Sequence, residues 1–255
     1  MLRVGVIGAG GRMGATVCDA VTADPDTELV AAVDPSATGR TAAGVEIVGT
    51  VNELVATGVD VVVDFTVADA ARENLPSLGY AGIDVVVGTS GLTAGDLAAL
   101  EADFGESTCL VVSNFAIGAV LMQRFAELAA PWFETAEIIE LHHDRKVDAP
   151  SGTALATAQR MAAASSDWAP DPTKRETVAG ARGAAAEDGI RVHSVRMRGL
   201  VAHQEVILGA EGQTLTIRHD SYDRSSFMAG VLVAAKGIGG LDNGVREGLD
   251  ELLGL

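Results

Sequence analysis

The chain has 255 residues, of which 48% are hydrophobic and 21% charged, so it can bury a substantial core and wholesale disorder is excluded. Its formal net charge of -17 disfavours general nucleic-acid binding, because such a surface would repel a phosphate backbone. No secretory leader and no apolar run of membrane-spanning length is evident, so we expect a cytoplasmic protein without a membrane or nucleic-acid partner.

The first half of the chain alternates between strand and helix signals. Short, mostly β-branched runs without strict alternation are typical of strands covered on both faces, and they predict strands at 2–7, 29–33, 59–65, 84–87 and 110–113. Helices are predicted between them at 13–23, 68–78 and 94–104, the last beginning with a capping box of Thr93 and Asp96. Cys18 and Cys109 fall inside these elements, which favours core packing over a disulfide. The rhythm predicts a Rossmann-like, doubly wound parallel sheet, an α/β fold.

The rhythm changes after residue 115. A helix is predicted near 118–131, a strand at 136–142 and a helix at 154–164, followed by a loop over 169–189. Three β-rich runs at 191–198, 202–209 and 214–218 are spaced as in an antiparallel meander, and helices are predicted at 225–238 and 245–253. We therefore expect a dinucleotide-binding domain formed by 1–115 with 222–255. Residues 116–221 are expected to form a second α+β domain with a mixed or antiparallel sheet, for substrate binding and oligomerisation.

A glycine-rich turn, G-A-G-G-R-M-G from Gly8 to Gly14, follows the first predicted strand and precedes a helix. This is the context of a dinucleotide-binding turn, although the spacing is G-x-G-G-x-x-G. Glycines let the backbone approach a pyrophosphate, and the helix N-terminus offers unpaired N–H groups. A tight turn without a ligand is the alternative, but the position at the start of a βαβ series favours nucleotide binding.

Asp34 ends the second predicted strand, about twenty residues beyond the glycines, where an acidic residue can bind the adenosine ribose of NAD. Arg12 and Arg40 are nearby in the sequence, and either could meet the 2′-phosphate of NADP. A solvated turn residue is the alternative for Asp34. We expect NADH, NADPH or both as cofactor, with dual or NAD-preferring use.

Further strand ends outline a crevice, because ligands of open α/β sheets bind beyond the carboxyl ends of the strands. Small hydroxyl residues and glycines at these ends suit a nicotinamide ribose and ring, and ordinary loop chemistry is the alternative. The predicted cofactor-binding residues are Gly8, Ala9, Gly10, Gly11, Arg12, Met13, Asp34, Phe65, Thr66, Gly88, Thr89, Ser90, Val112, Ser113, Asn114 and Phe115.

The segment from Glu140 to Ala154 carries the densest chemistry. Two histidines, an arginine and a lysine lie within residues 142–146, and Ser151-Gly152-Thr153 directly precedes an alanine-rich helix. Proton carriers, positive charge and an anion-binding helix end together suit a small dicarboxylate, with Lys or His supplying a proton as hydride arrives. Surface histidines, a solvated charge run and an ordinary helix cap are the alternatives.

A metal site formed by His142, His143 and Asp148 is also conceivable. Adjacent histidines point to opposite faces of a strand, and no further ligand pattern supports such a site, so we predict no metal.

This segment resembles the E-L-H-H-x-x-K-x-D-A-P-S-G-T-A signature of the 4-hydroxy-tetrahydrodipicolinate reductase family, which acts in the diaminopimelate route to lysine. The resemblance covers nearly the whole chain in order. Further matching segments are Gly8–Gly14, Asp64-Phe65-Thr66, Gly88-Thr89-Ser90-Gly91, Asn114-Phe115-Ala116-Ile117-Gly118, Gly180-Ala181-Arg182-Gly183, Arg218-His219-Asp220-Ser221 and Arg224-Ser225-Ser226-Phe227.

The resemblance implies an NAD(P)H-dependent reduction of the substrate ring with loss of its 4-hydroxyl as water, in a homotetramer joined through the sheets of the second domain. It implies His142 as proton donor or acceptor and Lys146 as catalytic proton donor. The implied substrate-binding residues are His143, Ser151, Gly152 and Thr153.

Two other functions are compatible with the residues alone. Another small-acid or amino-acid dehydrogenase of the same two-domain plan would share the cofactor crevice and differ in 140–154. A non-catalytic nicotinamide nucleotide sensor would bind cofactor without turnover, but it leaves the cluster around His142 and Lys146 without a role.

Overall fold

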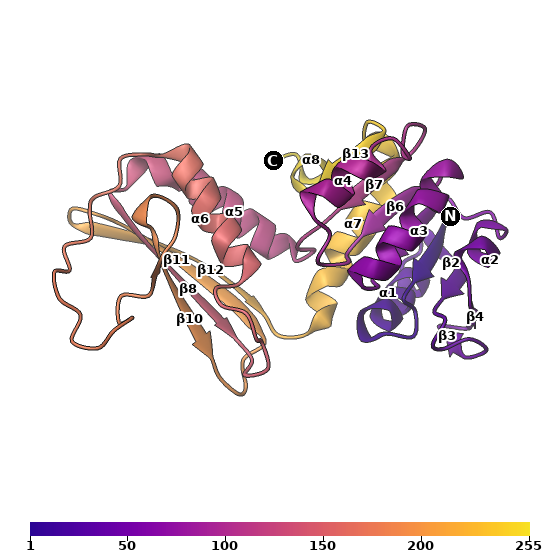
Figure 1. The fold of residues 1–255 in the computed structure, drawn as a ribbon, viewed down its shortest axis with the longest axis horizontal. Helices are drawn as coiled ribbons and strands as arrows, with labels where there is room; N and C mark the ends of the chain where they lie inside the picture. The colour runs from indigo at the N-terminus through magenta and orange to yellow at the C-terminus, as the bar shows by residue number, and fades with distance from the viewer. The chain divides into compact units, whose positions relative to one another are not determined.

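The computed structural model describes residues 1–255 and divides into two compact units. Met1–Ala116 and Arg224–Leu255 form the first unit, and the continuous stretch Ile117–Asp223 forms the second (Figure 1). The last 32 residues therefore belong to the same unit as the N-terminus.

The first unit contains an eight-stranded sheet in the order β13-β7-β6-β5-β1-β2-β4-β3. Every pairing is parallel except that of β3 with β4. Valine-rich central strands are buried along their length, as expected for a parallel sheet with both faces covered. The strands are β1 (Leu2–Ile7), β2 (Thr27–Val33), β3 (Thr41–Ala42), β4 (Val45–Val48), β5 (Val61–Asp64), β6 (Asp84–Val87), β7 (Thr108–Val111) and β13 (Gly244–Glu247).

The helices of the first unit bury apolar faces against this sheet. Leu54, Leu75, Leu78 and Phe104 join the valines of the strands in one core cluster. The capping box of Thr93 and Asp96 is confirmed at the start of α4, and a second one, which the sequence analysis missed, opens α2. The helices are α1 (Arg12–Ala23), α2 (Val51–Val55), α3 (Ala68–Tyr80), α4 (Ala94–Leu100), α7 (Met228–Gly237) and α8 (Asp250–Leu253).

The prediction of one helix over 245–253 is wrong. Gly244 and Gly248 both adopt positive φ and interrupt the backbone on either side of a short strand, β13, which pairs in parallel with β7. Only the four residues of α8 are helical. Edge pairing with a strand more than a hundred residues away overrides the local helical pattern.

The second unit contains a five-stranded mixed sheet in the order β12-β11-β8-β10-β9. Its central strand β8 pairs in parallel with β10 and antiparallel with β11. The strands are β8 (Thr135–His142), β9 (Ala184–Ala185), β10 (Arg191–Arg196), β11 (Ala202–Ala210) and β12 (Gln213–Ser221).

The predicted meander of the last three strands is wrong in its order. Only β11 and β12 form a hairpin, because β8 lies between β10 and β11. The short connection from β10 to β11 therefore passes the end of β8, so residues of β10 become direct neighbours of the chemically dense strand end at His142.

Both helices of the second unit, α5 (Ile117–Ala129) and α6 (Gly152–Ala164), lie side by side on one face of the sheet (Figure 1). They bury Met122, Met161 and Ile138 in a second core cluster. On β8, Ala136, Ile138 and Glu140 are buried on one face, whereas Glu137, Ile139 and Leu141 on the opposite face are half-buried. No helix of the chain is long and apolar enough to cross a membrane.

Candidate active site

The glycine turn lies between β1 and α1 in the first unit, as its sequence context predicts. Gly8 adopts a φ of +82°, and a Cβ on Gly14 would lie 2.0 Å from the carbonyl oxygen of Gly8. Only glycine at position 14 therefore lets α1 start this close to the turn. No side chain caps α1, so its N-terminal dipole is open to an anionic ligand.

Asp34 closes the turn from the second strand. Its Oδ2 accepts the N–H of Gly10 at 3.0 Å, and its Oδ1 accepts the N–H and hydroxyl of Ser36 at 2.9 and 2.6 Å. The carboxylate is thus fixed in orientation, and its oxygens keep further lone pairs for a ribose hydroxyl.

A cavity of about 540 Å³ opens beside the turn in the first unit. Gly8, Gly11, Asp34, Phe65 and Thr66, all predicted to bind cofactor, line it. The sequence analysis missed the rest of its lining, which comes from the ends of β1, β2 and β4 and from α3. These residues are Ile7, Val33, Pro35, Ser36, Gly49, Thr50, Val51, Val67, Ala70, Glu73 and Asn74.

Two aromatic rings lie at neighbouring strand ends. The rings of Phe65 and Phe115 are 5.4 Å apart between centroids and tilted by 48°. A Cβ on Gly88 would lie 2.3 Å from the ring of Phe65, so glycine is required there. The structure therefore brings together three predicted residues that are far apart in sequence.

A buried carboxylate holds two of the predicted hydroxyl groups. Asp64 Oδ1 accepts the Thr89 hydroxyl at 2.5 Å and the Thr66 hydroxyl and N–H at 2.8 and 3.0 Å. Its Oδ2 is buried without a hydrogen-bond partner. Burial raises the pKa of Asp64, and the hydrogen bonds from Thr89 and Thr66 offset this only in part.

Asp64→Asn is expected to become more stable relative to the wild type as pH rises. A raised pKa means that the folded state holds the Asp64 proton more tightly than the unfolded state, so this group contributes stability that is lost above the unfolded-state pKa. Asparagine keeps the acceptor for both threonines and removes the ionisation. Thermal melts of both proteins at pH 4 and pH 8 measure the effect. A melting-temperature difference that does not change with pH would contradict it.

The other predicted cofactor residues are dispersed around these groups. Ala9 and Val112 are buried, Met13 is half-buried, and Asn114 Oδ1 accepts the N–H of Ala116 at 2.9 Å. Arg12, Arg40, Ser90 and Ser113 are exposed, and none of them lines the cavity.

His142 ends β8 in the second unit and contacts a carboxylate on the same strand. Its Nδ1 lies 2.5 Å from Oε2 of Glu140, which is fully buried two residues earlier on the same strand face. Arg196 of β10 donates to both carboxylate oxygens of Glu140, at 2.7 and 2.8 Å. Burial alone would raise the pKa of Glu140, but hydrogen bonds from Arg196, Ser194 and His142 more than offset it, so this pKa is lowered. Burial lowers the pKa of His142, and Glu140 counteracts part of this effect.

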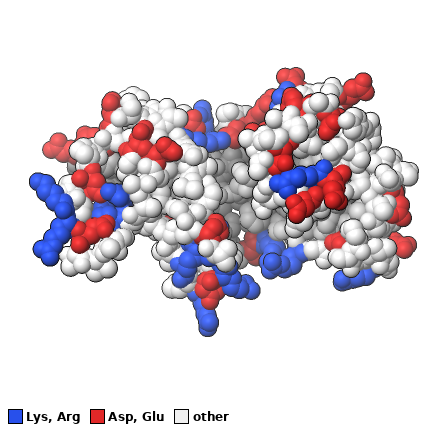
Figure 2. Space-filling view, viewed as in Figure 1, with Lys and Arg blue, Asp and Glu red and all other residues white.

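Lys146 lies in the loop that follows β8. Its Nζ contacts both carboxylate oxygens of Asp148, at 2.8 and 2.6 Å, with the lysine side chain 20% and the aspartate side chain 58% exposed. His143 is half-buried, and its Nδ1 accepts the N–H of Arg145 at 3.2 Å. Figure 2 shows Lys and Arg side chains gathered at the end of the second unit where β8 and β10 finish. Three of the cations in this part of the chain form ion pairs with neighbouring carboxylates: Lys146 with Asp148, Arg196 with Glu140 and Arg198 with Asp144.

The same loop leads into α6. Ser151 caps this helix by accepting the N–H of Ala154 at 3.2 Å, and its own N–H donates to Glu140 at 3.2 Å. Gly152 is exposed, and a Cβ on it would meet nothing within 4 Å. Thr153 follows, half-buried, in the first turn. The predicted carboxylate-binding helix end is therefore held next to Glu140.

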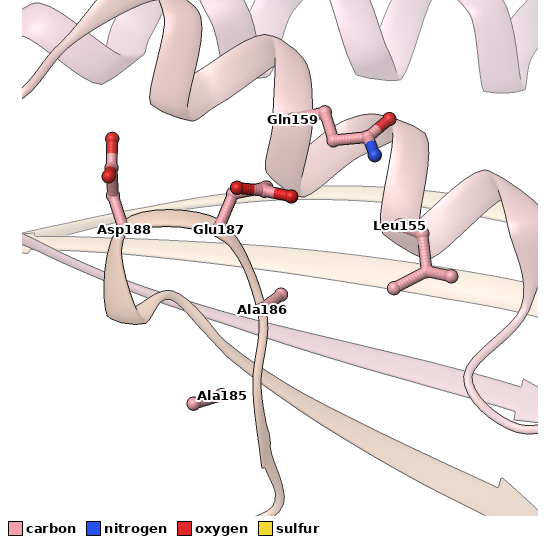
Figure 3. Close-up of a pocket in the computed structure, with 6 residues that line it drawn as sticks. All are labelled: Leu155, Gln159, Ala185, Ala186, Glu187 and Asp188. Atoms are coloured by element: carbon pink, nitrogen blue, oxygen red, sulfur yellow. The ribbon is translucent and has the colours of Figure 1, made fainter.

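Two observations concern other sites. The chain contains no group of three or more His, Cys, Asp or Glu residues arranged to hold a metal ion. A separate hollow of about 300 Å³ lies between α6 and the segment before β10 (Figure 3), lined by Leu155, Gln159, Ala185, Ala186, Glu187 and Asp188. None of these residues was predicted to be functional.

Sequence reasoning missed Asp64, Glu140, Asp148 and Arg196 as individual site residues. Glu140 could have been found, because it alternates with His142 and must share its strand face. Arg196 gave no such signal, since it becomes a neighbour only through the pairing of β10 with β8.

The first unit fits a dinucleotide. A helix N-terminus without a side-chain cap, a turn that admits only glycine at position 14, a fixed acidic residue and a cavity lined by strand ends all occur in one place. The second unit fits a small anion with ionisable groups beside it.

Comparisons with known proteins agree with both descriptions. The family models "Dihydrodipicolinate reductase, N-terminus" and "Dihydrodipicolinate reductase, C-terminus" match residues 2–115 and 118–253. A 4-hydroxy-tetrahydrodipicolinate reductase of Cutibacterium acnes is 51% identical, with all of both chains covered. One of Nocardia farcinica is 49% identical, covering 100% of this chain and 99% of the relative.

Solved structures give the same result. The dipicolinate-bound dihydrodipicolinate reductase of Paenisporosarcina sp. TG-14 is similar with a TM-score of 0.86 and 39% identity, over 98% of this chain and 99% of that one. An engineered D-amino acid dehydrogenase bound to NADP+ has a TM-score of 0.60 at 16% identity, over 99% and 95%, and shares the fold alone. With both family models matched and half of all residues identical to a full-length relative, the chain belongs to the dihydrodipicolinate reductase family.

Proposed function

We propose that the protein reduces 4-hydroxy-tetrahydrodipicolinate to tetrahydrodipicolinate with NADH or NADPH, in the diaminopimelate route to lysine. One observation carries the proposal. His142, Lys146 and the N-terminus of α6 lie within one short segment, in which Glu140 contacts both His142 and Ser151, and the chain is 51% identical to a reductase of that name.

The cofactor would be held by the first unit. Gly8, Gly10, Gly11 and the start of α1 would take the pyrophosphate, Asp34 the adenosine ribose, and Phe65, Thr66, Gly88 and Thr89 the remainder. When bound, NAD(P)H supplies a hydride to the substrate ring.

The second unit would bind and protonate the substrate. The backbone N–H groups of Gly152 and Thr153, directly after the Ser151 cap, belong to the positive end of the α6 dipole and would receive a carboxylate. The solved relative from Paenisporosarcina sp. TG-14 is bound to dipicolinate, which supports a dicarboxylate substrate. His143 would add a contact, and the ammonium of Lys146 would donate a proton as the 4-hydroxyl leaves as water.

His142 is suited to a different role from that of Lys146. Because Glu140 accepts from Nδ1, the neutral ring presents the lone pair of Nε2. Burial lowers the pKa of His142, which favours this neutral form at pH 7. We therefore assign proton delivery to Lys146 and orientation or proton acceptance to His142.

The proposed cofactor use is dual or NAD-preferring. Asp34 is followed by Pro35 and Ser36, neither of which carries a positive charge to balance a 2′-phosphate, and the exposed Arg12 and Arg40 do not line the cavity. An aspartate at this position favours the free 2′-hydroxyl of NAD.

The other functions considered have less support. Resemblance to the amino-acid dehydrogenase is limited to the fold, since identity falls to 16%. A nucleotide sensor would not require the buried carboxylate that orients His142.

Reduction of enzymatically generated 4-hydroxy-tetrahydrodipicolinate, followed by nicotinamide absorbance, tests the proposal. We expect turnover with both cofactors and a catalytic efficiency with NADH at least equal to that with NADPH. A panel of amino acids and small 2-oxo acids is the comparison. Turnover of the panel without reduction of the dipicolinate precursor would refute the proposed substrate.

The proposal extends to a cytoplasmic homotetramer, with the cytoplasm as the compartment of the biosynthetic pathway. The helix-free face of the second unit's sheet carries Ile139, Leu141, Val195 and Ile207, all half-buried. A group of apolar side chains that a sheet face leaves partly exposed is typical of a subunit interface. Light scattering is expected to give four times the chain mass of 26.1 kDa, and Ile207→Glu a smaller assembly. A monomeric wild type would exclude this part of the proposal.

A further inference from the structure

A buried ion pair lies behind the proposed catalytic histidine. Glu140 has no exposed surface, and Arg196 binds both of its oxygens in a bidentate contact at 2.7 and 2.8 Å. Such pairs add little net stability, since removing two charges from water roughly cancels their attraction. An apolar pair of similar volume would satisfy the core equally well, so stability alone does not account for these two residues.

The pair touches every part of the proposed substrate site. Glu140 accepts from His142 Nδ1 at 2.5 Å and from the N–H of Ser151 at 3.2 Å. Arg196 also donates to the carbonyl oxygen of Asp148 at 2.7 Å, and the carboxylate of that same Asp148 holds Lys146 Nζ. One ion pair therefore contacts the strand end, the lysine loop and the cap of α6.

These contacts come from separate segments of the chain. His142 lies on β8, Asp148 in the following loop, Ser151 at the start of α6, and Arg196 more than forty residues later on β10. The loop between β8 and α6 has no regular structure of its own from 143 to 151. Its position thus depends on contacts from outside, and Arg196 supplies one at Asp148.

We propose that Glu140 and Arg196 are positioning residues for the reduction. They set the tautomer of His142, and they fix the Lys146 loop and the N-terminus of α6 in position relative to His142. The inference rests on the proposed function. Neither residue needs to touch the substrate for this role, so both act through His142 and through the backbone at Asp148 and Ser151.

The charged groups facing His142 are Glu140, Lys146 and Arg196. Glu140 favours the Nδ1-protonated neutral ring, whereas a free neutral histidine carries its proton mainly on Nε2. Loss of Glu140 should therefore change which ring nitrogen is protonated, and a merely structural residue would not have this effect.

The test uses the full-length protein and the double variant Glu140→Leu with Arg196→Met. This change replaces the buried pair with apolar side chains and leaves no unpaired charge, so it is expected to fold. Glu127→Gln is the matched control, because Glu127 also pairs with an arginine in the second unit, Arg124 at 2.7 Å on α5.

We expect the double variant to melt within a few degrees of the wild type and to lose about 10-fold to 100-fold in kcat, as when an orienting partner of a catalytic histidine is removed. KM for NADH should not change, since the proposed cofactor residues belong to the first unit. Nitrogen-15 spectra of the histidines should show His142 protonated on Nδ1 in the wild type and on Nε2 in the double variant. His142→Asn identifies the resonance.

A folded double variant with wild-type kcat and an unchanged His142 tautomer would overturn the inference. Failure of the double variant to fold would transfer the test to Glu140→Gln, which keeps an acceptor for His142 and removes the charge. The pKa of His142 should then fall, and an unchanged titration would again overturn the inference. If the wild type reduces no substrate, the proposed function fails instead, and the tautomer measurement still decides whether the pair orients His142.

Discussion

Lys146→Ala is expected to lower kcat by about 10²-fold to 10⁴-fold, the range typical of a lost general acid. Its ammonium contacts the carboxylate of Asp148 in the loop after β8, and the lysine side chain is 20% exposed. Binding of NADH, measured by fluorescence titration, should be unchanged, because the proposed cofactor residues lie in the other unit.

Arg145→Ala is the matched control for this prediction. It removes the same charge one residue earlier, from an exposed side chain, and keeps the backbone N–H that donates to His143. We expect its kcat to stay within about threefold of the wild type, because a general acid must be positioned rather than merely charged. Full reduction of the dipicolinate precursor by Lys146→Ala would exclude Lys146 as the proton donor.

Gly14→Ala is expected to raise the Kd for NADH at least 10-fold and to lower the melting temperature. The new Cβ would lie 2.0 Å from the Gly8 carbonyl oxygen and 2.9 Å from the Cα of Ala9, so α1 must move away from the turn. Overpacking of this kind costs about 1–3 kcal/mol, which corresponds to a fall of about 2–12 °C for a chain of this size. Calorimetry and isothermal titration measure the two effects.

Gly95→Ala is the control for Gly14→Ala, because it also introduces alanine near the start of a helix but is not expected to destabilise the protein. Gly95 is near the start of α4, and a Cβ there would meet only the Thr93 hydroxyl oxygen, at 3.6 Å. Alanine in a helix is favoured over glycine by about 0.5–1 kcal/mol, so this variant should melt at the same or a higher temperature. Equal melting temperatures and NADH affinities for Gly14→Ala and the wild type would show that the turn tolerates a side chain.

The Rossmann-like sheet could be predicted because its signals are local. β1 and β6 begin and end at the predicted residues, and the box of Thr93 and Asp96 opens α4 as expected. The sequence did not reveal β13, a short strand that pairs with the distant β7. It predicted a strand at the position of β10, but it did not reveal the parallel pairing of β10 with β8, which is also distant in sequence.

The same distinction applies to the site. His142, Lys146 and Ser151 lie in one continuous stretch, so the sequence alone could predict that they belong to one site. Arg196 looks like any charged residue at the end of a strand until the sheet pairs it with His142. Asp64 was named only within a segment that matches the family, because its burial and its hydrogen bond from Thr89 follow from sheet packing.

The division of the chain has a consequence for synthesis. The second unit is one continuous stretch inserted into the first, whose sheet is completed at its edge by β13 and packed by α7 from the last 32 residues. A chain emerging from the ribosome therefore has residues 117–223 available as a complete folding unit while the first unit still lacks an edge strand and a helix. Synthesis of the first unit begins before that of the second unit and ends after it. Until β13 has been synthesised, the parallel sheet has an open edge at β7, where unwanted strand pairing can occur.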